Sequence, residues 1–227
     1  MNLKEHYNNL YSEFLIKLNS SNVAVDEQLY SAADKRFGIT LVIVPPENVK
    51  EKIQLFLNEL KKIEPEQYYY RNSDIHITVM SIISCYNNFS LEKINVKDYL
   101  TVINNCLSNI KNFSIEFCGI TATQSAIMIQ GFPSNNHLNL FRDNLRREFA
   151  LTILEQSLDK RYSIQTAHST VVRFQNKIRQ KEKFVQVLNK FKDYEFGKFD
   201  VNQITFVAND WYQKKEKVQV LKTLNLD

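Results

Sequence analysis

Residues 76–79 read His76-Ile77-Thr78-Val79, and residues 168–171 repeat the pattern as His168-Ser169-Thr170-Val171. The chain has only four histidines, so half of them occupy this motif. Each motif lies in a run of apolar and β-branched residues that is typical of a strand. Side chains in a strand alternate between its two faces, so each histidine shares a face with the threonine two positions on. The repeat therefore predicts two strands that each present an imidazole and a hydroxyl on one face.

The segments around the two motifs also recur in the same order. A strand ends at a proline, an amphipathic helix follows, and a linker leads to the motif strand, which lies about 35 to 40 residues beyond the leading strand. The first copy comprises a strand at 39–44, a helix at 49–63 and a motif strand at 75–83. The second comprises a strand at 126–132, a helix at 138–153 and a motif strand at 162–174. This order predicts a duplicated lobe.

The remaining apolar patterns complete an α+β architecture. Residues 3–18 carry one apolar stripe at helical spacing, and residues 96–110 and 184–191 show the same period. Further strands are predicted at 68–71, 113–123, 201–207 and 218–224. Short connections between helices and strands favour antiparallel sheets in two pseudo-twofold lobes around a central cleft.

The expected domain organisation follows from these elements. We expect an N-terminal helical extension at 1–36 and a single bilobal domain at 37–227, with lobes at approximately 37–112 and 113–227 and the exchange of strands between lobes left open. The sequence leaves open whether this extension caps the cleft, mediates dimerisation or only adds to the hydrophobic core.

Composition narrows the class of protein. Of the 227 residues 44% are apolar and 24% are charged, which is ordinary for a globular protein. The formal net charge of +4 and a pI near 8.8 suit an anionic ligand but fall short of the basic density of a dedicated duplex-DNA binder. The three cysteines lack Cys-x-x-Cys spacing, so a disulfide framework and a zinc ribbon are not indicated. The apolar runs are too short to span a bilayer, and we expect a soluble, cytoplasmic protein that does not bind membranes.

Two imidazoles and two hydroxyls in one cleft predict acid/base chemistry on a phosphate. One neutral imidazole takes a proton from water or a ribose hydroxyl, and the other, protonated, donates to the leaving oxygen. The threonine hydroxyls bind the non-bridging phosphate oxygens. The scheme needs neither metal nor cofactor, and the sequence has no His-Glu-x-x-His, Walker A or Gly-x-Ser-x-Gly motif.

The paired motifs resemble those of the two-histidine (2H) phosphoesterase superfamily. The longer second motif, His168-Ser169-Thr170-Val171-Val172-Arg173-Phe174, is similar to that of the 2′-5′ RNA ligase and cyclic phosphodiesterase branch, and the resemblance spans roughly residues 38 to 210. It implies a bilobal α+β hydrolase that cleaves 2′,3′-cyclic phosphates or related ribose phosphodiesters without a metal. It also implies that His76 and His168 are the acid/base pair and that Thr78 and Thr170 bind the phosphate.

Four further residues are candidate substrate contacts: Arg173, Phe174, Tyr70 and Trp211. Aromatic rings supply the stacking surfaces that single-stranded nucleic acids need. Arg173 can reach a phosphate, although strand parity points it away from His168 unless a bulge intervenes. Arg142, Arg146 and Arg147 form a charged run on a helix, which predicts a solvated face and only a weak candidate for steering RNA.

The sequence supports one hypothesis and keeps others open. The first is a 2H-type cyclic phosphodiesterase that acts as a monomer on an RNA terminus or a small nucleotide. A second is a module that binds RNA or a nucleotide in the same cleft without turnover, and a third is a 2′-5′ RNA ligase. Either motif alone is more often a polar pair on a strand, and the duplication is what favours catalysis.

Overall fold

Two antiparallel sheets form the framework of the computed structural model, which describes residues 2–160 and 163–226. Sheet A has the strand order β3-β1-β8-β9, and sheet B has the order β2-β6-β5-β4-β7. The strands of sheet A are β1 (Arg36–Ile43), β3 (Ile77–Asn87), β8 (Gln203–Asp210) and β9 (Gln219–Asn225). Those of sheet B are β2 (Tyr68–Tyr69), β4 (Phe113–Thr123), β5 (Ala126–Pro133), β6 (Ser169–Arg173) and β7 (Glu195–Val201). The predicted α+β class is confirmed.

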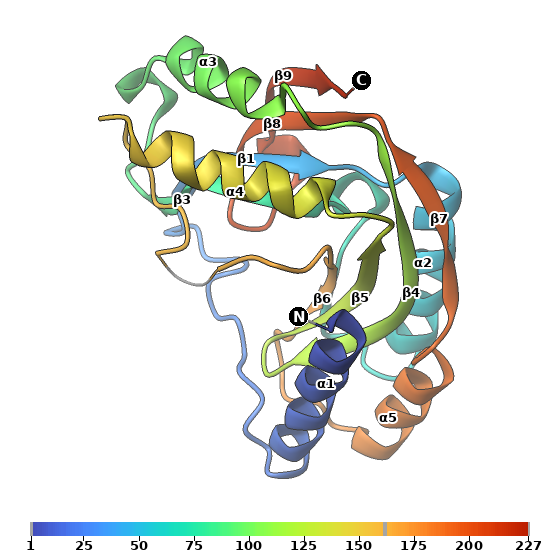
Figure 1. The fold of residues 1–227 in the computed structure, drawn as a ribbon. Coiled ribbons are helices and arrows are strands. Elements are labelled where there is room, and N and C mark those ends of the chain that lie inside the picture. Colours follow the sequence, from blue (N-terminus) through green and yellow to red (C-terminus); the bar gives the residue numbers. More distant parts are fainter. Residues whose placement is uncertain (1, 161–162, 227) are drawn as a thin grey trace.

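The helices are distributed over both sheets (Figure 1). They are α1 (Leu3–Asn19), α2 (Glu47–Lys61), α3 (Val96–Leu107), α4 (His137–Ala150) and α5 (Lys181–Lys190), with short 3-10 turns at Asn72–Asp74, Leu91–Lys93 and Lys215–Lys217. Helices α3 and α4 pack on each other, and α4 contacts β3 of sheet A. Helix α2 contacts β6 and β7 of sheet B and also α5. Each sheet therefore has a helical layer on its outer side.

The sheets do not follow the two halves of the chain. Strand β2 precedes the first motif, but it pairs with β6 of sheet B. Strand β8 pairs with β1 of sheet A although it lies near the C-terminus. Strands β7 and β8 follow each other with only Asn202 between them, so this part of the chain passes directly from sheet B to sheet A. Strand exchange thus ties the two lobes together.

The packed interior explains which parts of the apolar pattern become helix. In α2 the side chains of Val49, Ile53, Phe56 and Leu60 recur at three- and four-residue steps and are fully or almost fully buried. Pro46 supplies the N-cap and has the fixed backbone angle that suits a helix start. The pattern i, i+3, i+4 therefore identifies the buried face correctly here.

Two strand predictions differ from the structure. The second motif strand extends only over Ser169–Arg173 rather than 162–174, because residues 163–168 run without ladder pairing, and residue 162 lies outside the described residues. Strand β7 was not predicted, since 195–200 has only two large apolar residues, no β-branched residue and Gly197, which has a φ of 133°. Pairing with β4 supplies the ladder that local propensity does not.

Helix α1 lies on the side of sheet B opposite to α2 (Figure 1). Thr121 of β4 pairs with Met128 of β5, which pairs with Thr170 of β6, so these three side chains share one face. The Thr121 hydroxyl donates to the Tyr7 carbonyl of α1 at 2.8 Å. Helix α1 therefore packs on the face of sheet B that carries the second motif threonine.

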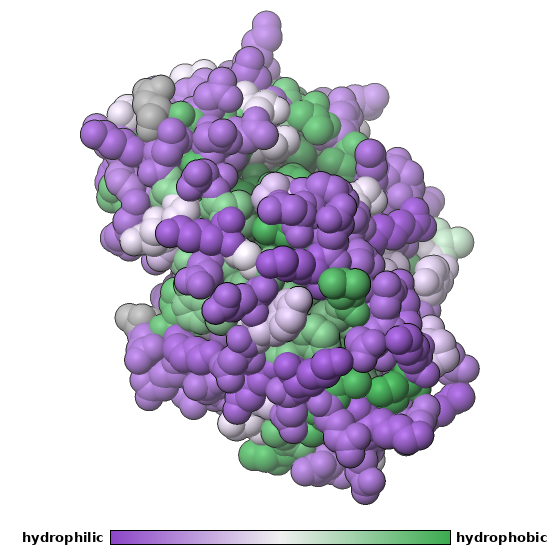
Figure 2. Space-filling view, turned by 90° about the vertical axis from the view of Figure 1, so that its right-hand side faces the viewer, coloured by the Kyte–Doolittle hydropathy of each residue, from purple (hydrophilic) through white to green (hydrophobic). Residues whose placement is uncertain are grey.

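The outer face over α2 and α5 is mainly hydrophilic, with hydrophobic residues in small separate groups (Figure 2). In the described parts of the chain, none of the helices combines the length and the apolar character needed to cross a membrane.

Candidate active site

One cavity brings the two motifs together. Its walls come from both sheets, and its lining includes all four motif side chains, which are His76, Thr78, His168 and Thr170. The predicted juxtaposition of the two imidazoles and two hydroxyls is therefore present in the geometry. The cavity also includes Arg173.

A β-bulge follows the motif threonine in both strands. In β3, Thr78 pairs with Val42 and Met80 with Leu41, so Val79 is an extra residue in the ladder. In β6, Thr170 pairs with Met128 and Val172 with Ile127, so Val171 is the extra residue. A bulge leaves one residue unpaired and reverses the facing of those that follow. The duplication thus extends to the backbone geometry of single residues.

The second bulge corrects the expected orientation of Arg173. Strict alternation would point Arg173 away from Thr170, since the two positions differ by an odd number. The extra residue Val171 shifts the alternation, so Arg173 lines the same cavity as Thr170. Ser81, which lies five residues after His76 as Arg173 does after His168, also lines the cavity.

His76 is held by the backbone of the preceding turn. Its Nδ1 lies 2.7 Å from the Asp74 carbonyl oxygen, which can only accept a hydrogen bond, so Nδ1 carries the proton. Burial lowers the pKa of His76, while the Asp74 carbonyl and carboxylate act in the opposite direction and Arg173 adds to the lowering. The Asp74 carboxylate itself accepts from Ser73 and from the backbone N–H of Lys215. Asp74 therefore contacts His76 through its main chain.

His168 is held by a hydroxyl instead of a carbonyl. Its Nδ1 lies 2.6 Å from Oγ1 of Thr166. Burial, followed by the charge of Arg142 and then by electrostatic interactions with His76 and Arg173, lowers the pKa of His168 to about 4. Both imidazoles are therefore neutral at pH 7, which suits a proton acceptor.

Arg142 lies fully buried behind the cavity, contrary to the prediction of a solvated face. Its guanidinium donates to the carbonyl oxygens of Val79 at 2.9 Å, Thr78 at 3.1 Å and Thr166 at 2.8 Å. Its side chain thereby joins the bulge of the first motif to the segment that enters the second. Burial lowers the pKa of Arg142 to about 10, so it stays charged at neutral pH.

The other two arginines of this helix are closer to the prediction. Arg146 pairs with Asp143 and Asp159, and Arg147 is 64% exposed and pairs with Glu148. Among the residues that the structure describes, no carboxylate forms an ion pair with Arg142. This buried cation has three main-chain carbonyls and the Asn139 side-chain oxygen as its partners, and it adds positive potential where a phosphate would bind.

Tyr70 supports Arg173 rather than offering an open stacking surface. Its ring is only 2% exposed, although it lines the cavity. The Tyr70 hydroxyl accepts a hydrogen bond from Nε of Arg173 at 3.1 Å. Its backbone N–H donates to the carbonyl of Val171 at 3.0 Å. Tyr70 thus donates a hydrogen bond to the carbonyl of the extra residue in the second motif, as Arg142 does in the first.

The last two candidate contacts have different positions. Phe174 is fully buried between Phe14 of α1 and Phe184 of α5 and does not line the cavity, so its ring is not available to a substrate. Trp211 follows β8, is partly exposed and lines the cavity, with the Arg36 guanidinium 4.7 Å from its ring centroid. Phe174 lies in the core because β6 ends just before it, at the point where the chain turns toward α5.

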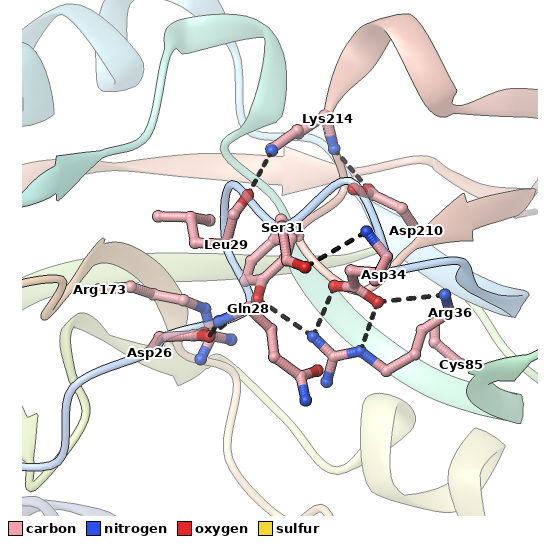
Figure 3. A network of polar contacts seen from close by, with 12 residues as sticks. Asp26, Gln28, Leu29, Ser31, Asp34, Arg36, Cys85, Arg173, Asp210 and Lys214 are labelled. Carbon is pink, nitrogen blue, oxygen red and sulfur yellow. Dashed lines mark hydrogen bonds and ion pairs between the residues drawn. The ribbon is translucent and has the colours of Figure 1, made fainter.

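Residues 20–35 connect α1 to β1, and several of them belong to a network of polar contacts that includes Arg173 (Figure 3). Asp26 lies beside Arg173 and accepts a hydrogen bond from the Tyr212 hydroxyl at 2.9 Å. Lys214 donates to the Leu29 carbonyl at 3.0 Å. Asp34 forms a two-pronged pair with Arg36, with both distances at 2.8 Å. These contacts fix the connection next to the arginine of the second motif.

Sequence reasoning did not single out Tyr7 or Thr166, and it placed Arg142 on a solvated face although its side chain is buried. The signal for Arg142 was present, because it follows Phe141 on the buried stripe that includes Leu138 and Leu145. Thr166 and Tyr7 depend on packing between distant segments, which local patterns do not encode. In the described ranges, His, Cys, Asp and Glu side chains form no group of three or more that could hold a metal ion.

Comparison with known proteins places this geometry in a family. Residues 37–226 match the AKAP7 2′5′ RNA ligase-like domain family. None of the curated proteins matches the chain. The match leaves α1 and the connection up to residue 36 outside the family region.

Solved structures with a similar fold include TT0787 of Thermus thermophilus, which is 15% identical and has a TM-score of 0.58 over 84% of this chain and 97% of that one. LigT of E. coli in complex with 3′-AMP is 13% identical, with a TM-score of 0.56 over 84% and 98%. A conserved protein of unknown function, ATU0111 of Agrobacterium tumefaciens, is 12% identical, with a TM-score of 0.54 over 93% and 97%. The chain therefore belongs to the AKAP7 2′5′ RNA ligase-like domain family, which confirms the resemblance of its motifs to the 2′-5′ RNA ligase branch of the 2H phosphoesterase superfamily.

Proposed function

We propose that this protein is a metal-independent phosphodiesterase that opens 2′,3′-cyclic phosphates or related ribose phosphodiesters on RNA ends or small nucleotides. The observation that carries the proposal is the single cavity in which both motif histidines, both motif threonines and Arg173 meet. Two imidazoles provide the acid and the base that phosphoester hydrolysis needs. Two hydroxyls and a guanidinium provide ligands for a phosphate.

The arrangement of charge supports phosphate binding between the two walls. Thr78 and Thr170 donate to non-bridging oxygens, and the Arg173 fork, held by Tyr70, compensates the charge that develops in the transition state. Arg142 contributes from behind the wall through its field alone, since each of its guanidinium nitrogens already donates to a backbone carbonyl or to the Asn139 side chain. A bound phosphate anion raises the pKa of both imidazoles and so makes one of them available as an acid.

The surroundings of the two imidazoles favour different roles. The Nδ1–H of His76 donates to the Asp74 carbonyl whether the imidazole is neutral or protonated, and the Asp74 carboxylate is nearby. His168 faces Arg142, which opposes its protonation. We therefore assign the general acid to His76 and the general base to His168. The base takes a proton from the attacking water, and the acid gives a proton to the departing ribose oxygen.

Ligands of a similar structure are consistent with a nucleotide substrate. Structures of E. coli LigT hold 3′-AMP in one case and phosphate in another. A nucleoside monophosphate is what ring opening of a 2′,3′-cyclic nucleotide yields. This likeness supports a ribose phosphate as the substrate class and leaves the choice of RNA terminus or free nucleotide to experiment.

The test is hydrolysis of the four 2′,3′-cyclic nucleotides in EDTA, with the position of the product phosphate read by phosphorus NMR. We expect turnover by the wild type and its loss in His76→Ala and His168→Ala. His137→Ala is the matched control, because His137 lies at the start of α4 outside the cavity. Folded wild type that binds a cyclic nucleotide without product would support the binding module, and joining of RNA ends would support the ligase.

A substrate that needs no acid tests the assignment of roles. Bis(p-nitrophenyl) phosphate releases p-nitrophenolate, which departs without a proton. We expect His76→Ala to retain activity on this ester and His168→Ala to lose it. The reverse pattern would exchange the two roles.

A further inference from the structure

Sheet A lines the cavity with a patch of four neutral polar side chains, which are Thr40, Ser81, Ser84 and Asn209. Thr40 of β1 pairs with Ser81 of β3, and Asn209 of β8 pairs with Gly38, two positions before Thr40. Every second residue of a strand returns to the same face, so Thr40, Ser81 and Asn209 share the face toward the cavity. The patch therefore continues the wall that begins with Thr78.

A bulge in β3 adds Ser84 to this face. Thr40 pairs with Ser81, whereas the preceding residue of β1 pairs with Ile83, so β3 has one extra residue between the two pairs. An extra residue shifts the alternation of faces in the strand that contains it. Ser84 thus lines the same cavity as Ser81, although the two positions differ by an odd number.

The polar groups of the patch lack partners within the protein. In the part of the chain that the structure describes, the hydroxyls of Thr40, Ser81 and Ser84 form no hydrogen bond. Thr40 is only 5% exposed, so its hydroxyl is enclosed beside the cavity. Asn209 is 6% exposed; its Nδ2 donates to the Asp210 carbonyl at 2.8 Å, and its Oδ1 is buried without a donor. Because buried polar groups in proteins are normally paired, these groups point to a polar ligand.

The chemistry of the patch fits a neutral ligand. It consists of hydroxyls and an amide without a cation, so it does not suit a second phosphate. The carboxylate of Asp159, which also lines the cavity, is paired with Arg146. Hydroxyls both donate and accept, as the ribose hydroxyls and the edge of a nucleobase require. Trp211, two positions after Asn209, lines the cavity at the end of the patch, where an aromatic ring can stack on a base.

The order of these groups along sheet A follows the parts of a nucleotide. Thr78, Thr40 and Asn209 lie at the levels of β1 positions 42, 40 and 38, and Ser81 lies beside Thr40. Two residues of a strand rise about 7 Å, so each step is comparable to one part of a nucleotide. With a phosphate at Thr78, the ribose lies over Thr40 and Ser81, and the base reaches Asn209.

We propose that the patch is a nucleoside subsite that favours a base with an amino group at the end farthest from the ribose, as in cytosine. This inference rests on the proposed function, since it describes the substrate of the same cavity. The Asp210 carbonyl engages Nδ2 of Asn209, so the amide presents only its oxygen to a base. Cytosine brings a 4-amino donor to this oxygen, whereas uracil brings a second oxygen that repels it.

The experiment compares hydrolysis of 2′,3′-cyclic CMP and 2′,3′-cyclic UMP, which differ only at positions 3 and 4 of the base. We expect kcat/KM of the wild type to be about fivefold higher for cyclic CMP, as for one net hydrogen bond, and equal for both in Asn209→Leu. Asn225→Leu, on the exposed outer strand β9, is the matched control and should keep the wild-type ratio. Equal values in the wild type, or a preference that survives in Asn209→Leu, would overturn the proposal.

Thr40→Val tests the position of the ribose, because valine keeps the shape of threonine and removes its hydroxyl. We expect KM to rise about fivefold for both cyclic nucleotides with the ratio between them unchanged. Thr223→Val, on β9, should leave both KM values as they are. An unchanged KM in Thr40→Val would contradict the placement of the ribose.

Binding without turnover separates the subsite from the reaction. Calorimetry with 3′-CMP and 3′-UMP measures the same discrimination on nucleotides that carry no cyclic phosphate. If the wild type hydrolyses neither cyclic nucleotide, the proposed function fails, while tighter binding of 3′-CMP still supports the subsite. Equal affinities for 3′-CMP and 3′-UMP, or binding of neither, would overturn it.

Discussion

Replacing Arg142 by methionine is expected to loosen the connection between the two motifs. Methionine has a similar length and fills an apolar space, but it cannot donate to the three carbonyl oxygens that the guanidinium now satisfies. Two of these carbonyls belong to Thr78 and Val79 of the first motif, and the third belongs to Thr166 before the second. The change therefore acts on stability and on the active site together.

The expected loss of stability in Arg142→Met is the sum of opposing contributions. Each hydrogen bond from a charged donor contributes about 1.5–3 kcal/mol, and the burial of an unpaired cation offsets part of that sum. Leaving the three buried carbonyl oxygens without a donor costs about 1–3 kcal/mol each, so a net loss of about 3–5 kcal/mol remains after that offset. We expect a loss of this size in the free energy of unfolding, which lowers Tm by about 10 °C in a chain of this length. Loss of the nearby cation also raises the pKa of His168.

The assay combines thermal unfolding with NMR titration of His168 in the methionine variant, the lysine variant and the control Arg147→Met. Arg142→Lys keeps the charge but cannot reach three carbonyls, so we expect a low pKa of His168 together with most of the stability loss. Arg147→Met alters an exposed side chain and should change stability by no more than about 0.5 kcal/mol. Wild-type Tm and wild-type pKa of His168 in Arg142→Met would refute the reasoning.

Further predictions concern pH, close packing and the phosphate ligand. Because the folded pKa of His168, about 4, lies below its ordinary value of 6.5, the unfolded chain binds more protons between these limits. The free energy of unfolding should fall by up to about 3 kcal/mol as pH drops from 6.5 to 4, and a His168→Gln variant should lose that part of the dependence. Inorganic phosphate should bind with proton uptake near pH 6, which calorimetry in buffers of different ionisation enthalpy detects; binding without uptake would contradict the raised imidazole pKa. Gly131→Ala would bring a Cβ into the Ala167 carbonyl, so we expect lower Tm and weaker activity, and unchanged crystal positions of His168 would argue against this. Tyr70→Phe should raise KM more than it lowers kcat, because it frees the Arg173 fork, and an unchanged KM would count against that role.

The sequence predicted the elements of the fold more fully than the details of the site. The apolar period located α2, α4, β4 and β5 to within a few residues, since these segments bury one regular face. The pairing of His76 and His168 in one cavity also followed from the repeat. Strand β7 and the irregular segment before β6 were missed because long-range pairing determines them. Phe174 and Arg142 were misplaced because parity and charge alone do not reveal the burial of a side chain.

The two bulges lie at matching positions of the two motifs, but the side chains and donors around them differ. In both motifs the extra valine turns the fifth residue after the histidine toward the cavity, where one wall has Ser81 and the other has Arg173. Each bulge also frees a carbonyl, which Arg142 satisfies at Val79 and the Tyr70 backbone satisfies at Val171. The shared backbone therefore holds two similar His/Thr pairs at fixed positions, while the surrounding donors and charges differ. Under the proposed function, these differences favour the second motif as the wall that holds the phosphate next to a neutral base, because Arg173 lines the cavity there and Arg142 opposes protonation of His168.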